Sequence, residues 1–394
     1  MNERPLAIRF GTLHHNAGEP RRNGVILIEG DKIASIGDGD KIPSGARVIE
    51  GAAVVPGLIN AHSHLEMSGE AQTTSVFVLT TPTQRAMTAA ENARKSLQGG
   101  VTTIREIGST ENIAIDLRDA IAAGRLPGPT ILAVGRPICM TGGHGWWAGR
   151  EADGPWDVRK AVREQWRSGA DGIKFIATGG VLTKGAVPGI EQLTEEELAA
   201  GIGEAHRHGM RCAAHAIGTG GIKNAIRAGV DSVEHGHLID AEGIALMVER
   251  GTYLVPTLSA IQCIIDAGPD AGMPDFVLRK AREIAEHAAT NLKAARAAGV
   301  KFAGGSDAGT PFNYHDAYAR EFELLQSMLD MSPREALATV TASAADLLGV
   351  ARGRLQPGEI ADLLVLEHDI DKDPLALRNP IAVIKGGRVA HERR

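Results

Sequence analysis

Residues able to bind a metal ion follow several short apolar segments, which are spread over about 250 of the 394 residues of this chain. They are His62 and His64 in VVPGLINAHSHL, Lys174 in GADGIKFIATGG, His215 in MRCAAHAIGTGG, His235 in GVDSVEHGHLI and Asp307 in VKFAGGSDAGTP. Imidazole nitrogens and carboxylate oxygens suit zinc and similar divalent metals. Because each residue lies at the end of a segment predicted to be a strand, we expect the side chains to converge at one mouth of a parallel barrel. The set predicts a binuclear metal centre.

His62 and His64 are two residues apart, so on an extended segment both side chains point to the same side and can reach one ion. The carboxylate of Asp307 can complete that site, and His215 with His235 can hold a second ion. A single buried His near a strand end is more often a hydrogen-bonded core residue. All these residues in this chain order favour metal binding over a series of unrelated core positions.

Lys174 lies at the inner end of the apolar segment GIKFIA. A buried ammonium is costly unless it is paired. One interpretation is an ion pair with a carboxylate. The other is reaction of the neutral amine with CO2, which gives an anionic carbamate that can bridge two cations and is stabilised by their charge.

Short apolar segments alternate with amphipathic helical stretches between about residues 54 and 350. The predicted strands are 54–60, 101–107, 130–135, 172–177, 211–216, 231–235, 252–257 and 301–305. Eight such units predict an α/β fold, a (β/α)8 TIM barrel over residues 56–350. A doubly wound open sheet is the alternative, but no GxGxxG follows the first strand.

The two ends of the chain differ from the middle. Short strands rich in Val, Ile and Leu occur in LAIRFGTLHH and NGVILIEGDKIASIG, and again in GEIADLLVLEHDI and IAVIKGGRVAHE. We therefore predict that residues 1–55 and 351–394 together form a small β-sandwich domain.

Composition limits the partners that we expect. The chain has 42 Lys plus Arg against 48 Asp plus Glu, a net charge of −6, so no basic surface for nucleic acid or membranes is predicted. Three Cys residues far apart argue against a disulfide framework, and neither a signal peptide nor an apolar run of 18 residues is found. We expect a cytoplasmic homo-oligomer that acts on a small-molecule substrate.

The motifs PGLINAHSHL, GGHG (142–145), IKFIATGG, AAHAIGTGGI, VEHGHLID, SDAGTP and LQPGEIADLLVL resemble the amidohydrolase superfamily over essentially the whole chain. The branch that they resemble is the imidazolonepropionase-related, prolidase-like (Xaa-Pro dipeptidase-like) group of metal-dependent hydrolases. The resemblance implies two divalent ions, with zinc expected. His62, His64 and Asp307 would hold one ion and His215 and His235 the other, with Lys174 bridging them as a CO2-derived carbamate.

The resemblance also implies a reaction, the cleavage of an amide or peptide-like C–N bond. A hydroxide shared by two cations would attack a polarised carbonyl, and Asp307 would carry its proton to the leaving amine. Lys174, and Gly218 where deaminases of the superfamily carry Glu, both argue against deamination. Ile217 stands where many peptidase-like relatives carry Tyr, which argues against a simple dipeptidase. Cyclic-amide, carbamate or urea hydrolysis at the same site is the alternative, and a catalytically silent scaffold is a remote one.

Other residues are predicted to surround the mouth. By resemblance, His144 contacts the substrate carbonyl or carboxylate; a loop His that caps a backbone group is the alternative. Trp146 and Trp147, with Trp156, lie in one predicted loop and favour an apolar or aromatic substrate, although ordinary packing explains them equally well.

Ile217 and His315 are further candidates for substrate contact at this mouth. The Gly-rich segment 178–192 could form a lid. Glu106, which closes the second strand, could orient a metal-binding His, and His237 is interpreted as a supporting or surface residue.

Overall fold

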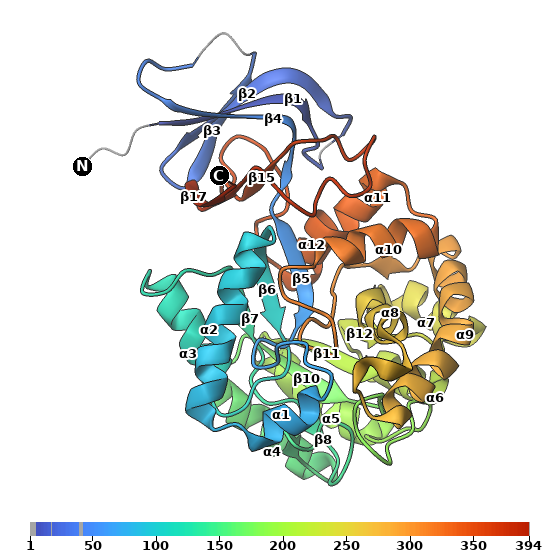
Figure 1. Ribbon diagram of the computed structural model, residues 1–394. Coiled ribbons are helices and arrows are strands. Elements are labelled where there is room, and N and C mark those ends of the chain that lie inside the picture. Colours follow the sequence, from blue (N-terminus) through green and yellow to red (C-terminus); the bar gives the residue numbers. More distant parts are fainter. Residues whose placement is uncertain (1–4, 17, 39–41, 394) are drawn as a thin grey trace.

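The structure is a computed structural model that describes residues 5–16, 18–38 and 42–393. It places the first and last strands of the chain in one small sheet, beside a larger body of alternating strands and helices (Figure 1). The domain boundaries predicted from the sequence, 1–55 with 351–394 and 56–350, stay a prediction.

The small sheet joins the two ends of the chain. Its strands are β1 (Leu6–Leu13), β2 (Arg21–Glu29), β3 (Lys32–Gly37), β4 (Arg47–Pro56), β15 (Leu363–Leu366), β16 (Ala382–Lys385) and β17 (Arg388–Glu392). They lie in the order β17-β16-β15-β4-β1-β2-β3, with β1 parallel to β4 and antiparallel to β2. Ile8, Ile26, Val54, Leu363 and Ile384 are buried in one common core, so N- and C-terminal strands stabilise each other.

The larger body contains the barrel. Its strands are β5 (Leu58–Ser63), β6 (Val101–Glu106), β7 (Thr130–Ala133), β10 (Gly172–Ile176), β11 (Arg211–Ala216), β12 (Ser232–His235), β13 (Tyr253–Val255) and β14 (Lys301–Phe302). Neighbours pair in parallel, β5-β6-β7 in one sheet and β10 to β14 in another. Every residue of β5, β6 and β10 is buried, as expected for parallel strands covered on both faces.

Backbone hydrogen bonds beyond the regular strands close the ring. Asp171 N donates to Ala133 O at 2.7 Å, which joins β7 to β10. Ala61 N donates to Gly304 O at 2.9 Å and Asp307 N to His62 O at 2.8 Å, which joins the end of β14 to β5. The predicted (β/α)8 barrel with a separate β domain from both termini is therefore confirmed, and seven of the eight predicted strand segments contain an observed barrel strand. The sequence predicted a β-sandwich for the small domain, whereas its described strands form one seven-stranded sheet.

The first predicted strand segment, 54–60, belongs to two strands rather than one. Residues up to Pro56 pair within the small sheet as β4, and Leu58 begins β5 in the barrel. Gly57 separates them, and a Cβ there would lie 2.3 Å from Thr102 Oγ1. The chain can pass from one sheet to the other at this close approach because position 57 has no side chain.

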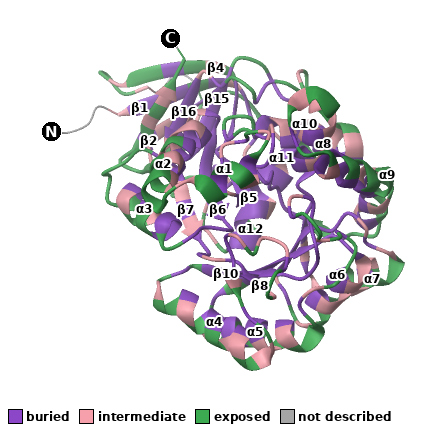
Figure 2. Cartoon of the chain, turned by 60° about the horizontal axis from the view of Figure 1, so that its bottom comes forward, coloured by how far each residue is buried: buried purple, intermediate pink, exposed green. Residues whose placement is uncertain are grey.

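Helices surround the barrel, with buried residues along the strands and the inward sides of helices and exposed residues outside (Figure 2). They are α1 (Thr73–Leu79), α2 (Pro82–Gln98), α3 (Ile113–Ala122), α4 (Pro155–Arg167), α5 (Glu195–Arg207), α6 (Thr219–Arg227), α7 (Ala241–Arg250), α8 (Leu258–Ala267), α9 (Asp275–Ala297), α10 (Ala319–Leu329), α11 (Pro333–Ala338) and α12 (Ala344–Leu348). Helices α2 and α5 each begin with a capping box, formed by Thr81 with Gln84 and by Thr194 with Glu197. These side chains form hydrogen bonds with backbone amides at the start of each helix.

Two short strands, β8 (Ile138–Cys139) and β9 (Arg150–Glu151), lie in the connection after β7 and were not predicted. Their pairing with each other and of β8 with β10 fixes the ends of the loop that carries His144, Trp146 and Trp147.

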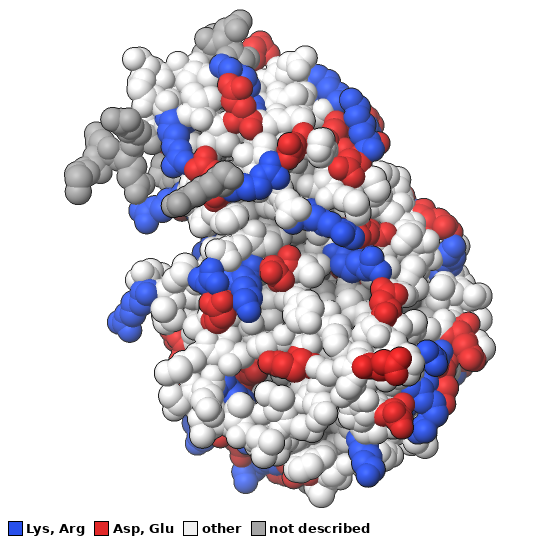
Figure 3. All heavy atoms as spheres, in the orientation of Figure 1, with Lys and Arg blue, Asp and Glu red and all other residues white. Residues whose placement is uncertain are grey.

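The face drawn in Figure 3 carries Lys and Arg interspersed with Asp and Glu, without a broad patch of one sign. Among the helices of residues 5–16, 18–38 and 42–393, none is both long and apolar enough to cross a membrane.

Candidate active site

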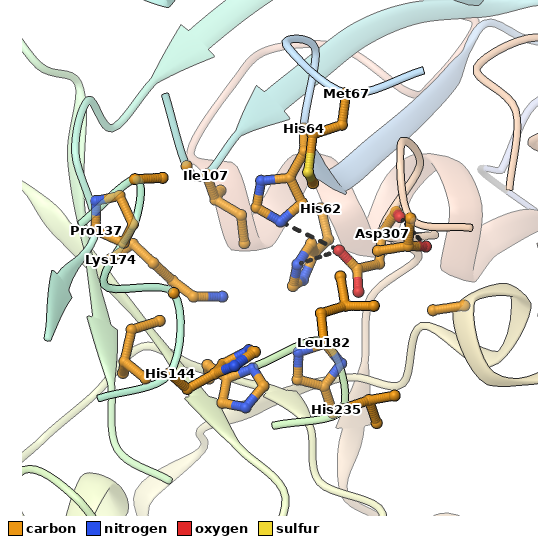
Figure 4. Close-up of a pocket in the computed structure, with 18 of the residues that line it drawn as sticks. His62, His64, Met67, Ile107, Pro137, His144, Lys174, Leu182, His235 and Asp307 are labelled. Carbon is orange, nitrogen blue, oxygen red and sulfur yellow. Dashed lines mark hydrogen bonds and ion pairs between the residues drawn. The ribbon is translucent and has the colours of Figure 1, made fainter. Parts of the chain in front are cut away.

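A cavity lies at the carboxyl ends of the barrel strands. Its lining includes the six predicted metal ligands, which are His62, His64, Lys174, His215, His235 and Asp307, and also His144 (Figure 4). The ring of His215 lies 4.5 Å from the rings of both His144 and His235, measured between ring centroids. Residues that are up to 245 positions apart in the chain are thus brought together because parallel barrel strands end at the same mouth.

His62 and His64 both direct Nε2 toward one carboxylate oxygen. The distances from Nε2 to Asp307 Oδ1 are 3.2 Å for His62 and 3.1 Å for His64, drawn as dashed lines in Figure 4. These two imidazoles lower the pKa of Asp307 well below its usual range, although its burial acts in the opposite direction. A carboxylate with two imidazole nitrogens is the donor set of a divalent-metal site.

The second ring nitrogen of His62, Nδ1, forms a hydrogen bond with a residue that was not predicted from the sequence. His62 Nδ1 donates to Glu234 Oε2 at 2.8 Å, and Glu234 is fully buried on β12. Nδ1 therefore carries a proton, and in the neutral ring Nε2 presents a lone pair toward Asp307. Two lone pairs 3.2 Å apart repel each other unless a proton or a metal cation lies between them, so the arrangement fits a metal ion at this position.

Arg105 of β6 supports Glu234 from inside the barrel. Its Nη2 donates to Glu234 Oε1 at 2.8 Å, its Nε to Ala61 O at 2.7 Å and its Nη1 to Ser232 Oγ at 3.1 Å. Burial alone raises the pKa of Glu234, but the Arg105 charge and the hydrogen bond from His62 lower it to about 2. The carboxylate thus stays ionised and holds His62 in one tautomer.

His235 and His215 are oriented in the same way. Thr257 Oγ1 donates its proton to Pro256 O, so His235 Nδ1, 2.7 Å away, must donate to that hydroxyl. His215 Nε2 donates to Gly179 O at 3.1 Å. Each ring is left with one unprotonated nitrogen, and burial lowers the pKa of both far below the usual value, which keeps both rings in the neutral form that can bind a metal.

Backbone strain marks the same strand ends. His235 has φ 71°, Thr257 φ 48° and Asp307 φ 59°, which is the left-handed region that residues other than Gly rarely adopt. One ligand atom each from His62, His235 and Asp307 lie within 4.8 Å of one another. Strained backbone that aims buried polar side chains at a shared point is characteristic of a functional site.

Lys174 extends from β10 into the cavity with its amine facing the His62–Asp307 cluster (Figure 4). It is 3% exposed, and within the described residues no hydrogen bond or ion pair reaches its Nζ. Burial lowers the pKa of Lys174 to about 8; the Glu234 and Asp307 charges oppose this shift, and the Arg105 charge adds to it. The ion pair that the sequence left open as an alternative is therefore not formed with any of these residues.

His144 lies in the loop between β8 and β9, against the ring of His215. Its Nδ1 is 2.9 Å from Thr183 Oγ1, and burial lowers the pKa of His144 to about 3. Gly180 lies so close that a Cβ there would be 2.4 Å from His144 Nε2. The ring is thus neutral and fixed at the cavity wall.

The predicted substrate contacts lie at different depths. Ile217 and Trp147 line the cavity, whereas Trp146 is half exposed and lines an adjoining outer groove that shares Trp147 and Leu182 with it. His315 is not among the lining residues: it is buried, and its Nε2 donates to Met67 O at 2.8 Å. Trp156 is the second residue of α4, is 79% exposed and is not among the residues that line the cavity.

One supporting residue differs from expectation. Glu234, not Glu106, contacts the predicted metal ligand His62; Glu106 is fully buried, and burial together with the nearby Glu66 raises its pKa well above normal. His237 is buried in the cavity lining, with Nε2 donating to Pro256 O at 2.8 Å. A signal for Glu234 and Arg105 did exist in the sequence, since each is a charged residue inside a segment that was predicted to be a barrel strand.

Comparison with known proteins identifies the family. The amidohydrolase family profile matches residues 53–390. An ochratoxinase from Aspergillus niger is 30% identical over 423 aligned positions, covering 97% of this chain and 86% of the ochratoxinase. A crystal structure of a Xaa-Pro dipeptidase with methionine bound in its active site has a TM-score of 0.90 and 33% identity, covering 99% of this chain and 100% of the other. A prolidase in complex with N-methylphosphonate-L-proline has a TM-score of 0.90 and 27% identity, covering 99% of this chain and 100% of the prolidase chain.

The fold and the cavity together define a hydrolase barrel with a donor set for a divalent metal. The chain belongs to the amidohydrolase family, and the resemblance seen in the sequence is confirmed. It is a hydrolase that acts on C–N bonds of the amide, peptide or cyclic-amide-like kind.

Proposed function

We propose that this chain is a binuclear metal-dependent amidohydrolase that cleaves an amide or related C–N bond beside an apolar or aromatic group. The observation that carries the proposal is the convergence of His62, His64, His215, His235 and Asp307 around a buried Lys174 that pairs with none of the described residues. Two divalent ions, zinc by the chemistry of the donors, would polarise the substrate carbonyl and lower the pKa of the attacking water.

The donors fit a division into two sites. His62, His64 and Asp307 would hold one ion, because both imidazoles already face the same carboxylate oxygen. His215 and His235 would hold the other. The neutral amine of Lys174 would attack CO2, form an N–C bond and release one proton, which gives the bridging carbamate. Its lowered pKa, about 8, supports this reaction because the neutral amine is then accessible near neutral pH.

Asp307 and His144 have different roles in the proposed reaction. Asp307 accepts a proton from the attacking water and delivers it to the leaving nitrogen. His144 is held through Nδ1 by Thr183, so Nε2 is the atom that faces the substrate and donates to its carbonyl oxygen. The apolar wall excludes other water from the reacting atoms.

The lining favours a neutral, apolar group next to the scissile bond. Met67, Phe77, Ile107, Val181 and Ile217 belong to it, and of the described residues that line the cavity none is Arg or Tyr. A free carboxylate would thus lack the usual cationic or phenolic partner. Relatives are named as dipeptidases and as an ochratoxinase, and this lining supports a non-peptide amide. It equally supports a cyclic amide, carbamate or urea, which is the second candidate.

Metal analysis and a substrate screen test the proposal together. Enzyme prepared with zinc and bicarbonate should contain about two metal ions per chain and lose activity with a chelator. N-acyl amino acids, dipeptides, lactams, carbamates and aryl amides would be compared for release of the amine. A stoichiometry that stays at one ion, with Lys174 unmodified by mass spectrometry, would contradict the binuclear centre. Absence of metal and of turnover would instead support a silent scaffold.

The tryptophans should set substrate preference. We expect Trp147→Ala and Trp146→Ala to reduce kcat/KM for an aromatic substrate by one to two decades, since burial of such a group contributes about 1.5–3 kcal/mol. A small aliphatic substrate with the same bond should lose less. Trp147 should have the larger effect because it lines both the cavity and the outer groove.

Trp156→Ala is the matched control, because that side chain is 79% exposed on α4 and lines neither space. Equal losses for aromatic and aliphatic substrates in the first two variants would show that the tryptophans only pack the loop.

A further inference from the structure

Lys280 of α9 is a buried lysine that binds backbone instead of a carboxylate. It is 7% exposed, and its Nζ donates to Gly180 O at 3.1 Å, to Thr183 O at 2.9 Å and to Ala186 O. An ammonium has three N–H donors, so all of them are satisfied by this one segment. The ammonium also lies 5.2 Å from the centre of the Phe276 ring, a cation–π distance.

All three acceptors belong to the segment 178–192 between β10 and α5, which carries several glycines and little regular structure. Such a segment has few backbone hydrogen bonds of its own and would otherwise open at low cost. The sequence is compatible with a lid here. In the structure a cation from another part of the chain, almost 100 positions away, holds it closed.

The same segment holds His144. Thr183 contacts both Lys280 and His144. Its carbonyl accepts a hydrogen bond from Lys280, and its hydroxyl is 2.9 Å from His144 Nδ1. The hydroxyl also accepts from Gly145 N at 3.1 Å. Gln192 at the end of the segment accepts from His144 N at 2.9 Å. A displacement of the segment would therefore displace the His144 ring.

The segment also forms a wall of the cavity. Val181 and Leu182 line the cavity, and Leu182, Thr183 and Lys184 line the adjoining outer groove. The position of the segment thus determines the shape of both spaces, as well as the direction of His144 Nε2.

We propose that Lys280 is a positioning residue that latches segment 178–192 over the cavity and thereby sets His144 and the Leu182 wall for catalysis. A neutral side chain of the same length cannot replace it, because three carbonyl oxygens would lose their donor together. That Lys280 holds the segment in place is inferred from these contacts alone; its effect on turnover rests on the proposed function.

Limited trypsin digestion of the metal-loaded enzyme tests the latch without any substrate. Lys184 is exposed within the segment, so release of the segment should speed cleavage after Lys184. We expect Lys280→Met to raise that cleavage rate about tenfold or more, since loss of hydrogen bonds to a charged group increases the open population accordingly. Fragments 1–184 and 185–394 identify the cut by mass, and adding Lys184→Gln should remove it.

Lys293→Met is the matched control, because Lys293 lies on the same helix but is exposed and pairs with Asp330. Cleavage after Lys184 at the wild-type rate in Lys280→Met would overturn the proposal. Should that variant fail to fold, Lys280→Gln carries the same comparison, with a smaller expected increase because one amide keeps two of the donors.

Kinetics test the connection from Lys280 to His144. Lys280→Met and Thr183→Val should each lower kcat on an aryl amide that the wild type cleaves, with metal content unchanged. The double variant should be no worse than the worse single variant within about twofold, because both act on the position of one ring. Losses that multiply would show that Lys280 does not act through Thr183. If the wild type cleaves no amide, the proposed function fails while the trypsin comparison still decides the latch.

Discussion

Replacing Lys174 by Ala is expected to abolish turnover and to remove much of the bound metal. Lys174 lies in the wall of the cavity with no ion-pair partner in the described residues, and its proposed carbamate would supply a negative charge between the two proposed sets of metal ligands. Without it, two cations held close together repel each other with no shared negative charge, and double occupancy is disfavoured. Elemental analysis should show a fall from about two ions per chain toward one or fewer.

A second lysine of the barrel provides the control. Lys301→Ala removes a lysine at the opposite end of β14, where it is exposed beside the Tyr253 ring, and should leave metal and activity unchanged. Short-chain carboxylates such as formate or acetate should restore part of the activity of Lys174→Ala by taking the place of the carbamate. Full activity of Lys174→Ala without any additive would mean that Lys174 only packs the barrel.

The strand order and the approximate place of the cavity could be predicted because both depend on local patterns. Buried parallel strands carry continuous apolar runs, as in GIKFIA and RCAAHA, and the helices between them are amphipathic. Once the barrel is accepted, residues at strand ends must converge, which is why the sequence alone could assign His62, Lys174, His215 and Asp307 to one cavity.

The contacts that orient those residues were not predictable in the same way. The bond from His62 to Glu234 joins positions 172 residues apart, and which of two buried carboxylates, Glu106 or Glu234, is in reach depends on strand stagger. The three bonds of Lys280 to segment 178–192 depend likewise on where α9 packs. A pattern in sequence shows that a residue faces the interior, but not which partner it meets there.

The tryptophans and His315 illustrate the same limit within loops. Trp146 and Trp147 are adjacent, yet only Trp147 reaches the cavity lining, because the short strands β8 and β9 fix the path of that loop. His315 follows the last barrel strand, as a substrate-binding residue would, but its ring is used to hold Met67 O. Position in a loop therefore limits a side chain to a region without determining its direction.

Asp307→Asn is expected to keep the fold and lower kcat by ~10³-fold or more, because the residue is both a proposed metal ligand and the proposed proton carrier. Asn has the same shape and is, with Asp, among the residues that best tolerate the left-handed backbone, here φ 59°. The backbone bond from residue 307 to His62 O, 2.8 Å long, is also retained. The amide, however, has no negative charge to face His62 and His64 and cannot accept a proton at neutral pH.

The measurement is steady-state kinetics beside circular dichroism and metal analysis. Asp330→Asn is a matched control, since Asp330 also has a left-handed backbone, φ 55°, but lies at the exposed end of α10 and outside the cavity lining. It should retain wild-type kcat. If Asp307→Asn lost metal but recovered most of its activity at high zinc concentration, Asp307 would be a ligand only. Activity within tenfold of wild type at ordinary zinc would exclude Asp307 from the chemistry altogether, and another group would have to move the proton from water to the leaving nitrogen.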